Sequence, residues 1–106
     1  MNIEALKDFT NKLNIYLLCD VGNGTYSKES KNSIESWNIK FKDEFILNNN
    51  TLEFRGNEAN FKFNINDIKE FKIDYGYYET EIDEFYLKYQ EDIYRFTFEN
   101  TFYDYN

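Results

Sequence analysis

Residues 61–75 read FKFNINDIKEFKIDY, and apolar and polar side chains alternate on both sides of a central break. The apolar positions are Phe61, Phe63 and Ile65 before the break and Phe71, Ile73 and Tyr75 after it. Alternation with a period of two is typical of a strand that buries one face. Asn66 and Asp67 form the break, because both residue types favour turns. The stretch therefore predicts two strands, the second of which ends at Gly76.

The same alternation extends upstream as far as Trp37. An expected strand from Trp37 to Leu47 has its inward positions at Trp37, Ile39, Phe41, Phe45 and Leu47. After a turn at residues 48–50, a further strand turns Leu52 and Phe54 inward. Gly56 and Asn57 then turn the chain back before Ala59. Together with the two strands above, the pattern predicts four strands between residues 37 and 75.

Residues 79–90 fit two different periods. Ile82, Phe85, Tyr86 and Tyr89 match one face of a helix, and Phe85, Leu87 and Tyr89 match one face of a strand. We favour the strand, because residues 90–92 suit a hairpin connection and the residues after them alternate again. The apolar positions of that last strand are Tyr94, Phe96 and Phe98.

The N-terminal segment has helical spacing instead. Its apolar residues recur at Ile3, Leu6, Phe9, Leu13 and Tyr16 or Leu17. This stripe predicts a helix from Ile3 to about Leu18, with Asn2 as its N-cap and the glycine-containing segment 20–24 as its end. Residues 25–36 are polar and predict either a loop or one short second helix.

The expected fold class is α+β, with an N-terminal helix packed on an antiparallel meander sheet of about five to six strands. At 106 residues the chain is expected to form a single domain. Within it, residues 1–24 hold the helix and its turn, and residues 37–99 hold the sheet.

Composition narrows the classes of function. The net charge of −8 opposes direct binding to nucleic acid or to an anionic membrane. The chain has no histidine and a single cysteine, Cys19, so the common zinc sites and the Ser-His and Cys-His nucleophile pairs are missing. We therefore expect no enzyme, no catalytic residue, no metal and no cofactor. Gly22-Asn23-Gly24 is expected to be a helix C-cap, since both phosphate-loop patterns are absent.

Cys19 closes a short apolar run, residues 15–19, and is expected to be a small core residue. The run is too short for a membrane span and lacks the flanks of a signal peptide. A cytoplasmic location is the expectation.

Acidic and aromatic residues gather in the last forty positions. Residues 67–106 hold 11 acidic against 4 basic residues, and 13 of the 22 aromatics. The first 66 residues hold 9 acidic and 8 basic residues. A carboxylate surface that also carries tyrosine suits a cationic groove that normally receives nucleic acid.

The candidate partner-binding residues come from this acidic segment. They are Asp74, Tyr75, Tyr77, Tyr78, Glu79, Glu81, Asp83, Glu84, Glu91 and Asp92. In an extended chain Glu79, Glu81 and Asp83 project on one side at intervals of about 6.6 Å, comparable to phosphate spacing. Two alternatives are a solvated edge that resists strand pairing and a Ca²⁺ or Mg²⁺ site, although the Asp-x-Asp-x-Asp-Gly loop is absent. Of the tyrosines around Gly76, at least one is expected to be exposed.

Two resemblances add expectations. Residues 50–56 (NTLEFRG) and 61–73 (FKFNINDIKEFKI) resemble the strand, strand, Asp-Ile, strand order of bacterial pleckstrin-homology-like domains. That resemblance implies a structural or adaptor module whose sheet edge or pocket binds a peptide or protein partner.

The chain as a whole, short, strongly acidic and without a catalytic set, is similar to phage-encoded anti-CRISPR and anti-restriction proteins that imitate DNA. This similarity of type implies a non-enzymatic inhibitor in the bacterial cytoplasm. Its acidic, aromatic surface would occupy the groove of a basic nucleic-acid-binding protein, such as a CRISPR effector or a restriction nuclease. We take this function as the first expectation and the adaptor module as the alternative.

Overall fold

A computed structural model describes residues 2–17, 23–42, 44–57, 59–76 and 82–99. The described residues form one α-helix, eight strands and one short 3-10 helix. The elements are α1 (Ile3–Leu17), β1 (Asn23–Ser30), β2 (Ser33–Lys40), β3 (Ile46–Leu47), β4 (Thr51–Arg55), β5 (Asn60–Asn64), η1 (Ile65–Asp67), β6 (Ile68–Tyr75), β7 (Ile82–Tyr89) and β8 (Asp92–Phe98). The α+β class and the N-terminal helix are confirmed.

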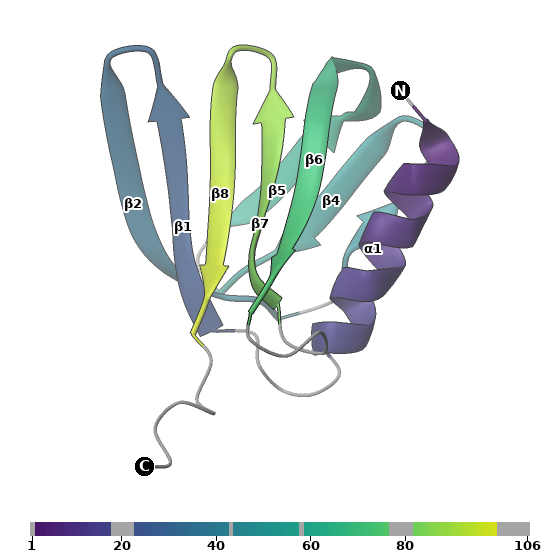
Figure 1. Cartoon of the computed structure of the whole chain (residues 1–106), viewed down its shortest axis with the longest axis horizontal. Coiled ribbons are helices and arrows are strands. Elements are labelled where there is room, and N and C mark those ends of the chain that lie inside the picture. Colours follow the sequence, from purple (N-terminus) through teal and green to yellow (C-terminus); the bar gives the residue numbers. More distant parts are fainter. Residues whose placement is uncertain (1, 18–22, 43, 58, 77–81, 100–106) are drawn as a thin grey trace.

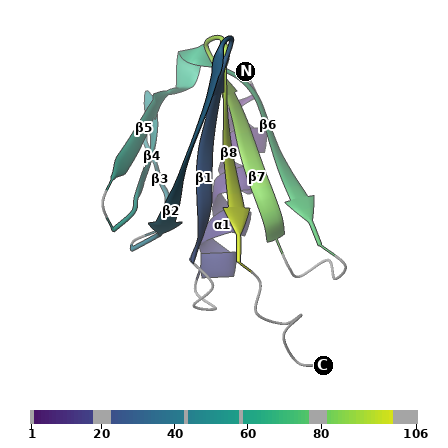
Figure 2. The same cartoon turned by 90° about the vertical axis from the view of Figure 1, so that its left-hand side faces the viewer.

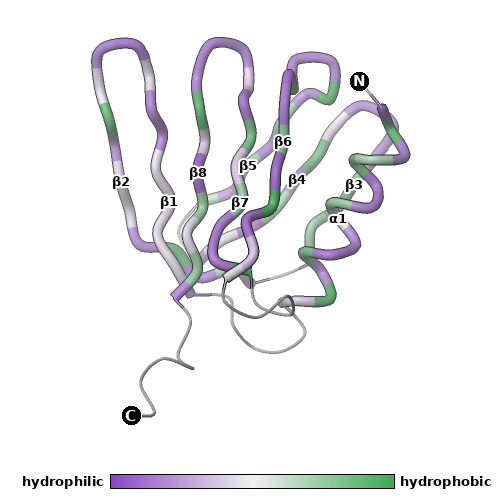
Figure 3. The backbone as a smooth tube through the Cα atoms, in the orientation of Figure 1, coloured by the Kyte–Doolittle hydropathy of each residue, from purple (hydrophilic) through white to green (hydrophobic). Residues whose placement is uncertain are grey.

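The strands form two antiparallel sheets, where the sequence predicted a single meander. The larger sheet has the order β2-β1-β8-β7-β6, and the smaller one has the order β3-β4-β5. The second sheet lies behind the first in Figure 1, and the two diverge from a common end in Figure 2. Apolar and polar segments follow one another along the strands, as Figure 3 shows. Among the longer strands, β7 and β8 turn several apolar side chains into the space between the sheets, whereas β1 and β2 turn one each.

Three phenylalanines at the centre of the molecule hold the sheets together. Phe85 of β7 and Phe96 of β8 are opposite each other in the ladder, and their rings stack with centroids 4.6 Å apart. Phe54 of β4 meets them edge-on, at 5.9 Å from Phe85 and 5.0 Å from Phe96. All three side chains are almost completely buried. Edge-to-face contacts of this kind add to the free energy of apolar burial.

Helix α1 closes one side of the sandwich, because it contacts the edge strands β3 and β6. Its start is capped as predicted, since the Asn2 side chain accepts hydrogen bonds from the backbone of Glu4 (3.0 Å) and Ala5 (3.3 Å). The buried stripe is Leu6, Phe9, Leu13 and Tyr16. Near its other end, Asn14 accepts a hydrogen bond from the backbone N–H of Phe45 and donates one to its carbonyl. The predicted last residue, Leu18, and Cys19 lie outside the described residues.

Residues 25–36 were predicted as a loop or a helix, and that prediction is wrong. They form most of the β1–β2 hairpin, which pairs with β8 at the edge of the larger sheet. Only Tyr26 is buried in β1 and only Ile39 in β2, so backbone pairing rather than an apolar face defines these strands. The predicted helix C-cap is wrong for Asn23 and Gly24, since both lie in β1. Glycine is needed at position 24 because a β-carbon there would collide with the Thr97 carbonyl oxygen.

The expected strand from Trp37 to Leu47 is also interrupted. β2 ends at Lys40, Phe41 forms a single bridge to Gly56, and β3 begins at Ile46. The inward parity of Phe41 and Phe45 is nevertheless correct, since both are buried. The interruption lets the chain pass from one sheet to the other.

The remaining strands follow the sequence. β4 buries Leu52 and Phe54, and β5 and β6 lie where residues 61–75 predicted them. The ambiguous residues from Ile82 onward form strand β7, as favoured. Its hairpin to β8 turns at Gln90, whose φ of 55° is the left-handed conformation of a tight turn.

The packing of the central rings predicts unequal effects of two phenylalanine substitutions. Phe96→Ala should lower the free energy of unfolding by about 3–5 kcal/mol, because it leaves a cavity between the sheets. Phe61→Ala should cost less than half as much, because Phe61 is only partly buried beside an open groove. Urea melts of both variants measure the difference. Equal losses would mean that the groove is closed in the molecule.

The close approach of β1 to β8 predicts that Gly24→Ala lowers the free energy of unfolding by about 1–3 kcal/mol, since backbone must move. Gly76→Ala is the matched control, because its β-carbon would meet the Asp83 carboxylate at 2.6 Å, and a side chain can rotate away. Thermal melts that rank Gly76→Ala as the more damaging change would contradict the strand placement of Gly24.

Candidate functional site

The predicted acidic residues are divided between two ends of the larger sheet. Asp74 of β6 and Glu84 of β7 are cross-strand neighbours, and Tyr75 beside them is 43% exposed. Glu91 and Asp92 lie at the other end of β7, in and after the hairpin turn. Because a strand advances about 3.3 Å per residue, the length of β7 separates the two groups by about 25 Å. Tyr77, Tyr78, Glu79 and Glu81 lie outside the described residues.

Several of these carboxylates are paired with cations of the same chain. Glu84 lies 2.8 Å from Arg95, Asp74 lies 3.2 Å from Lys72, and Asp92 lies 3.7 Å from Lys28. Arg95 also lies 3.8 Å from Glu29. The local field of this part of the acidic segment is therefore weaker than its composition indicates.

The outer face of the larger sheet continues this polar network. The Tyr86 hydroxyl donates a hydrogen bond to Glu70 at 3.0 Å, and the Arg95 guanidinium lies over the Tyr86 ring. The bond to the carboxylate holds the pKa of Tyr86 above its usual value. The face is charged in both signs, and its carboxylates mostly have partners.

A different surface stands out on the side of the sandwich opposite α1. There the edge strand β2 faces the edge strand β5, at the near side of the molecule in Figure 2. Between them lies a groove of about 390 Å³, here called the β2–β5 groove. It is lined by Tyr26, Trp37, Asn38, Ile39, Asn57, Ala59 and Phe61. Aromatic and aliphatic residues make up most of this lining, and Asn38 and Asn57 add polar groups.

The aromatic wall of the groove is preformed. Trp37, 49% exposed, stacks on Tyr26 with ring centroids 5.2 Å apart and planes 15° apart. Tyr26 in turn stacks on the buried Phe96 at 5.1 Å, and Phe61 meets Tyr26 edge-on at 4.7 Å. The exposed indole is thus fixed to the core by a continuous row of rings. A side chain held in this way loses little conformational freedom when a partner binds.

Burial raises the pKa of the Tyr26 hydroxyl to about 12, with further contributions from Tyr94, Glu35 and Asp92. A neutral phenol therefore lies under the groove throughout the physiological range of pH. The carboxylates near it oppose its ionisation.

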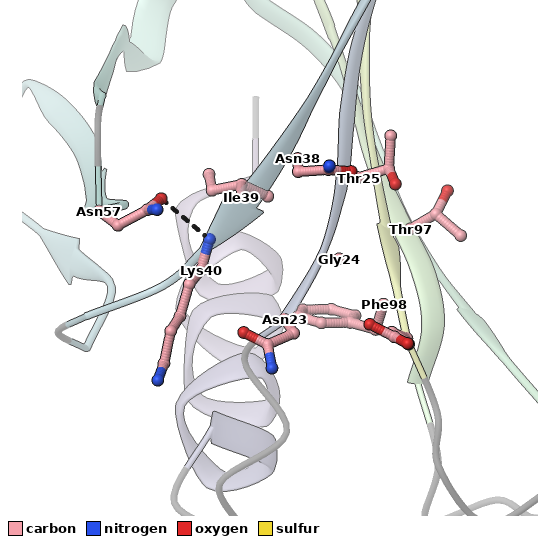
Figure 4. A pocket seen from close by; sticks show the side chains of 10 residues that line it. Asn23, Gly24, Thr25, Asn38, Ile39, Lys40, Asn57, Thr97 and Phe98 are labelled. Carbon is pink, nitrogen blue, oxygen red and sulfur yellow. Dashed lines mark hydrogen bonds between the residues drawn. The ribbon is translucent and has the colours of Figure 1, made fainter. Parts of the chain in front are cut away.

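A more polar hollow of about 540 Å³ adjoins the groove and shares Asn38, Ile39 and Asn57 with it. Figure 4 shows this polar hollow around Gly24 and the ends of β1, β2 and β8. Asn57 reaches Lys40 at the end of β2, where its side-chain oxygen accepts from the Lys40 N–H (3.2 Å) and its own N–H donates to the Lys40 carbonyl (2.8 Å). Asn57 thus pairs with the last residue of β2 as a neighbouring strand would.

The rest of the outer edge of β2 has no such partner. Ser30 and Ser33 close the two-residue β1–β2 hairpin, so the odd-numbered residues of β2 bond to β1 and the even-numbered ones point outward. The bonds of Lys40 to Asn57 agree with this alternation. The outward N–H and C=O groups of Ile34, Ser36 and Asn38 have no hydrogen-bond partner within the described residues. A bare strand edge therefore borders the apolar groove.

Sequence reasoning missed this surface, because it placed Trp37 inward and treated the preceding residues as a loop. Trp37 does lie on the predicted face of its strand, but the smaller sheet does not extend over it. The available signal was the single tryptophan of the chain at the start of a strand pattern.

Within the described ranges, no three acidic, histidine or cysteine side chains gather closely enough to hold a metal ion. Over the same ranges, no helix has the length and apolar character needed to cross a membrane. Comparisons of the chain with protein-family models, curated proteins and solved structures found no match. The two resemblances described above therefore stay predictions.

The raised pKa of Tyr26 predicts a pH-dependent contribution to stability. An unfolded tyrosine ionises near pH 10 and the folded Tyr26 near pH 12, so the contribution is complete below about pH 10 and is lost as the pH rises toward 12. Urea melts should therefore show that the parent loses stability relative to Tyr26→Phe between about pH 8 and about pH 11. A difference that stays constant with pH would contradict the burial of this hydroxyl.

Proposed function

We propose that the protein is a protein-binding module that receives an exposed segment of a partner protein in the β2–β5 groove. The half-exposed Trp37, fixed on Tyr26 at the side of the sandwich that α1 leaves open, carries this proposal. The module acts by binding, as an adaptor or as an inhibitor, and the proposal assigns it no catalytic residue.

The physical support comes from how protein interfaces gain affinity. Rigid aromatic side chains in partly closed pockets contribute much of the binding free energy of an interface, and tryptophan is the most enriched of them. A surrounding polar rim satisfies the partner's hydrogen bonds. Here Trp37 supplies the anchor, and Asn57 and the backbone of Asn38 supply polar groups beside the groove. The net charge of −8 favours a basic partner.

A second candidate is an inhibitor that occupies the nucleic-acid groove of a basic protein through the acidic surface. The pairing of Asp74 with Glu84 across two strands, next to the exposed Tyr75, favours it. Association through such a surface would depend strongly on salt, because exposed charges are screened.

For the groove, the expected result is that Trp37→Ala removes binding while Ile34→Ala leaves it intact. Ile34 is the matched control, because it is 73% exposed on the same strand but on the opposite face. A display library of random twelve-residue peptides, selected against the parent protein and both variants, measures this. The parent and Ile34→Ala should enrich the same clones, and Trp37→Ala should bind them at least tenfold more weakly. Clones that bind all three proteins equally would overturn the proposed function.

For the acidic surface, we expect the fourfold change Glu79→Gln, Glu81→Gln, Asp83→Asn and Glu84→Gln to preserve the fold and to weaken inhibition. Cleavage assays with a panel of bacterial CRISPR and restriction nucleases, at low and high salt, measure this effect. Glu4→Gln with Glu44→Gln is the control, since both residues are exposed and neither lines the hollow that contains Tyr75. A fourfold variant that inhibits as well as the parent, with the same salt dependence, would rule out the second candidate.

A further inference from the structure

We infer that the partner segment adds to the free edge of β2 as a further antiparallel strand, and that it presents aliphatic, bulky apolar and basic side chains in turn to Ile39, Trp37 and Glu35. This inference rests on the proposed function and specifies the chemistry of the partner segment. Three observations support it: the backbone groups of the edge, the side chains on its groove-facing side, and the charge of Glu35.

The backbone edge sets the length of the added strand. Ile34, Ser36 and Asn38 each offer one N–H and one C=O, so three residues provide up to six hydrogen bonds. At one end of this edge, the backbone N–H and C=O of Lys40 are already bonded to Asn57. At the other end lies the hairpin turn between β1 and β2. A segment of about seven residues fits between these limits. Extended peptides commonly bind to exposed sheet edges through such main-chain bonds.

The groove-facing side of β2 sets the side-chain pattern. Glu35, Trp37 and Ile39 share that face, and a strand beside them has its own side chains opposite at alternate positions. The position opposite Trp37 enters the groove toward Phe61 and Ala59 on the other wall. A bulky apolar side chain suits this position, and an aliphatic one suits the position beside Ile39.

The charge of Glu35 determines which type of side chain suits the third position of the partner segment. Glu35 is exposed and lies opposite Lys28 in the ladder. The Lys28 ammonium forms its ion pair with Asp92 at 3.7 Å, and Glu35 contributes to its field without forming one. No ion pair joins Glu35 to a cation among the described residues. A lysine or arginine opposite Glu35 would supply that cation where the apolar groove excludes part of the water.

A second copy of the chain is a poorer occupant of the same edge. If two copies pair through their β2 strands about a two-fold axis, the groove-facing residues of one copy lie opposite the groove-facing residues of the other. That face of β2 carries Ser33, Glu35, Trp37 and Ile39. None of these residues is basic, so every such register leaves Glu35 without a cation.

Isothermal titration calorimetry with synthetic peptides tests the inference. The probe is acetylated and amidated Thr-Ile-Thr-Phe-Thr-Lys-Thr, which places its alternate side chains opposite Ile39, Trp37 and Glu35. Methylation of the backbone nitrogens at the third, fifth and seventh positions of the peptide, which lie opposite Asn38, Ser36 and Ile34, should abolish binding, because the added strand needs these N–H groups to bond to β2. Methylation at the isoleucine, phenylalanine and lysine nitrogens, which point away, is the matched control. Replacing the peptide's lysine by glutamate should weaken binding at least tenfold, and Glu35→Lys in the protein should reverse that preference.

The outcomes separate the inference from the proposed function. If peptides methylated on the bonding nitrogens bind as well as the parent peptide, while Trp37→Ala still weakens binding, the groove is a binding site but strand addition is wrong. Equal affinity of the lysine and glutamate peptides would remove the role of Glu35. No binding of the unmethylated probe at millimolar concentration overturns the inference, and the library selection then decides the proposed function. A dimer in sedimentation equilibrium that Trp37→Ala dissociates would make a second copy the occupant.

Discussion

The stacking of Phe85 on Phe96, closed edge-on by Phe54, is the contact on which the rest of the structure depends. It joins two neighbouring strands of the larger sheet to the middle strand of the smaller one. Because the sheets diverge from this centre, each side of the sandwich needs its own cover. Helix α1 covers one side, where Asn14 bonds the backbone of Phe45 and Phe9 packs on Phe71. On the other side the sheets meet through the ring contact of Tyr26 with Phe61 and the bonds of Asn57 to Lys40, and no helix described covers it. The β2–β5 groove is thus open because a sheet of five strands packs on a sheet of three, and the helix covers the opposite side.

The sequence was informative wherever a strand buries a whole face. β4, β7 and β8 each bury alternate apolar residues, and period-two alternation was enough to predict them. The helix was predictable as well, because its buried residues recur every three or four positions and Asn2 caps its start. The β1–β2 hairpin was missed, because each of its strands buries a single side chain and its formation depends on backbone pairing with β8. The division into two sheets was missed too, since alternation predicts strands but not which ones pair.

The groove was beyond sequence reasoning for a related reason. Trp37 and Phe61 come together only when the two sheets pack, and the bare edge is recognisable only once the hairpin is known. The acidic site, by contrast, was proposed from local composition. That composition overstates the local field, because several carboxylates form ion pairs, in one case with a cation from outside the segment. Lys28 of β1 pairs with Asp92, and Arg95 of β8 lies between Glu84 and Glu29.

These pairings change what charge can do in this protein. Paired carboxylates contribute little to short-range recognition, yet the surplus of eight negative charges still acts at long range as a field that speeds the approach of basic partners. Such a field selects partners by charge and not by sequence, and salt screens it. Selection among basic segments then depends on contacts that exclude water, which affect dissociation more than association. In the described part of the chain, the β2–β5 groove has a fixed aromatic anchor, and the bare edge of β2 beside it carries Glu35, for which no ion pair is found there. Under the proposed function, association with a partner would therefore depend mainly on the net charge, and slow dissociation on the open side of the sandwich.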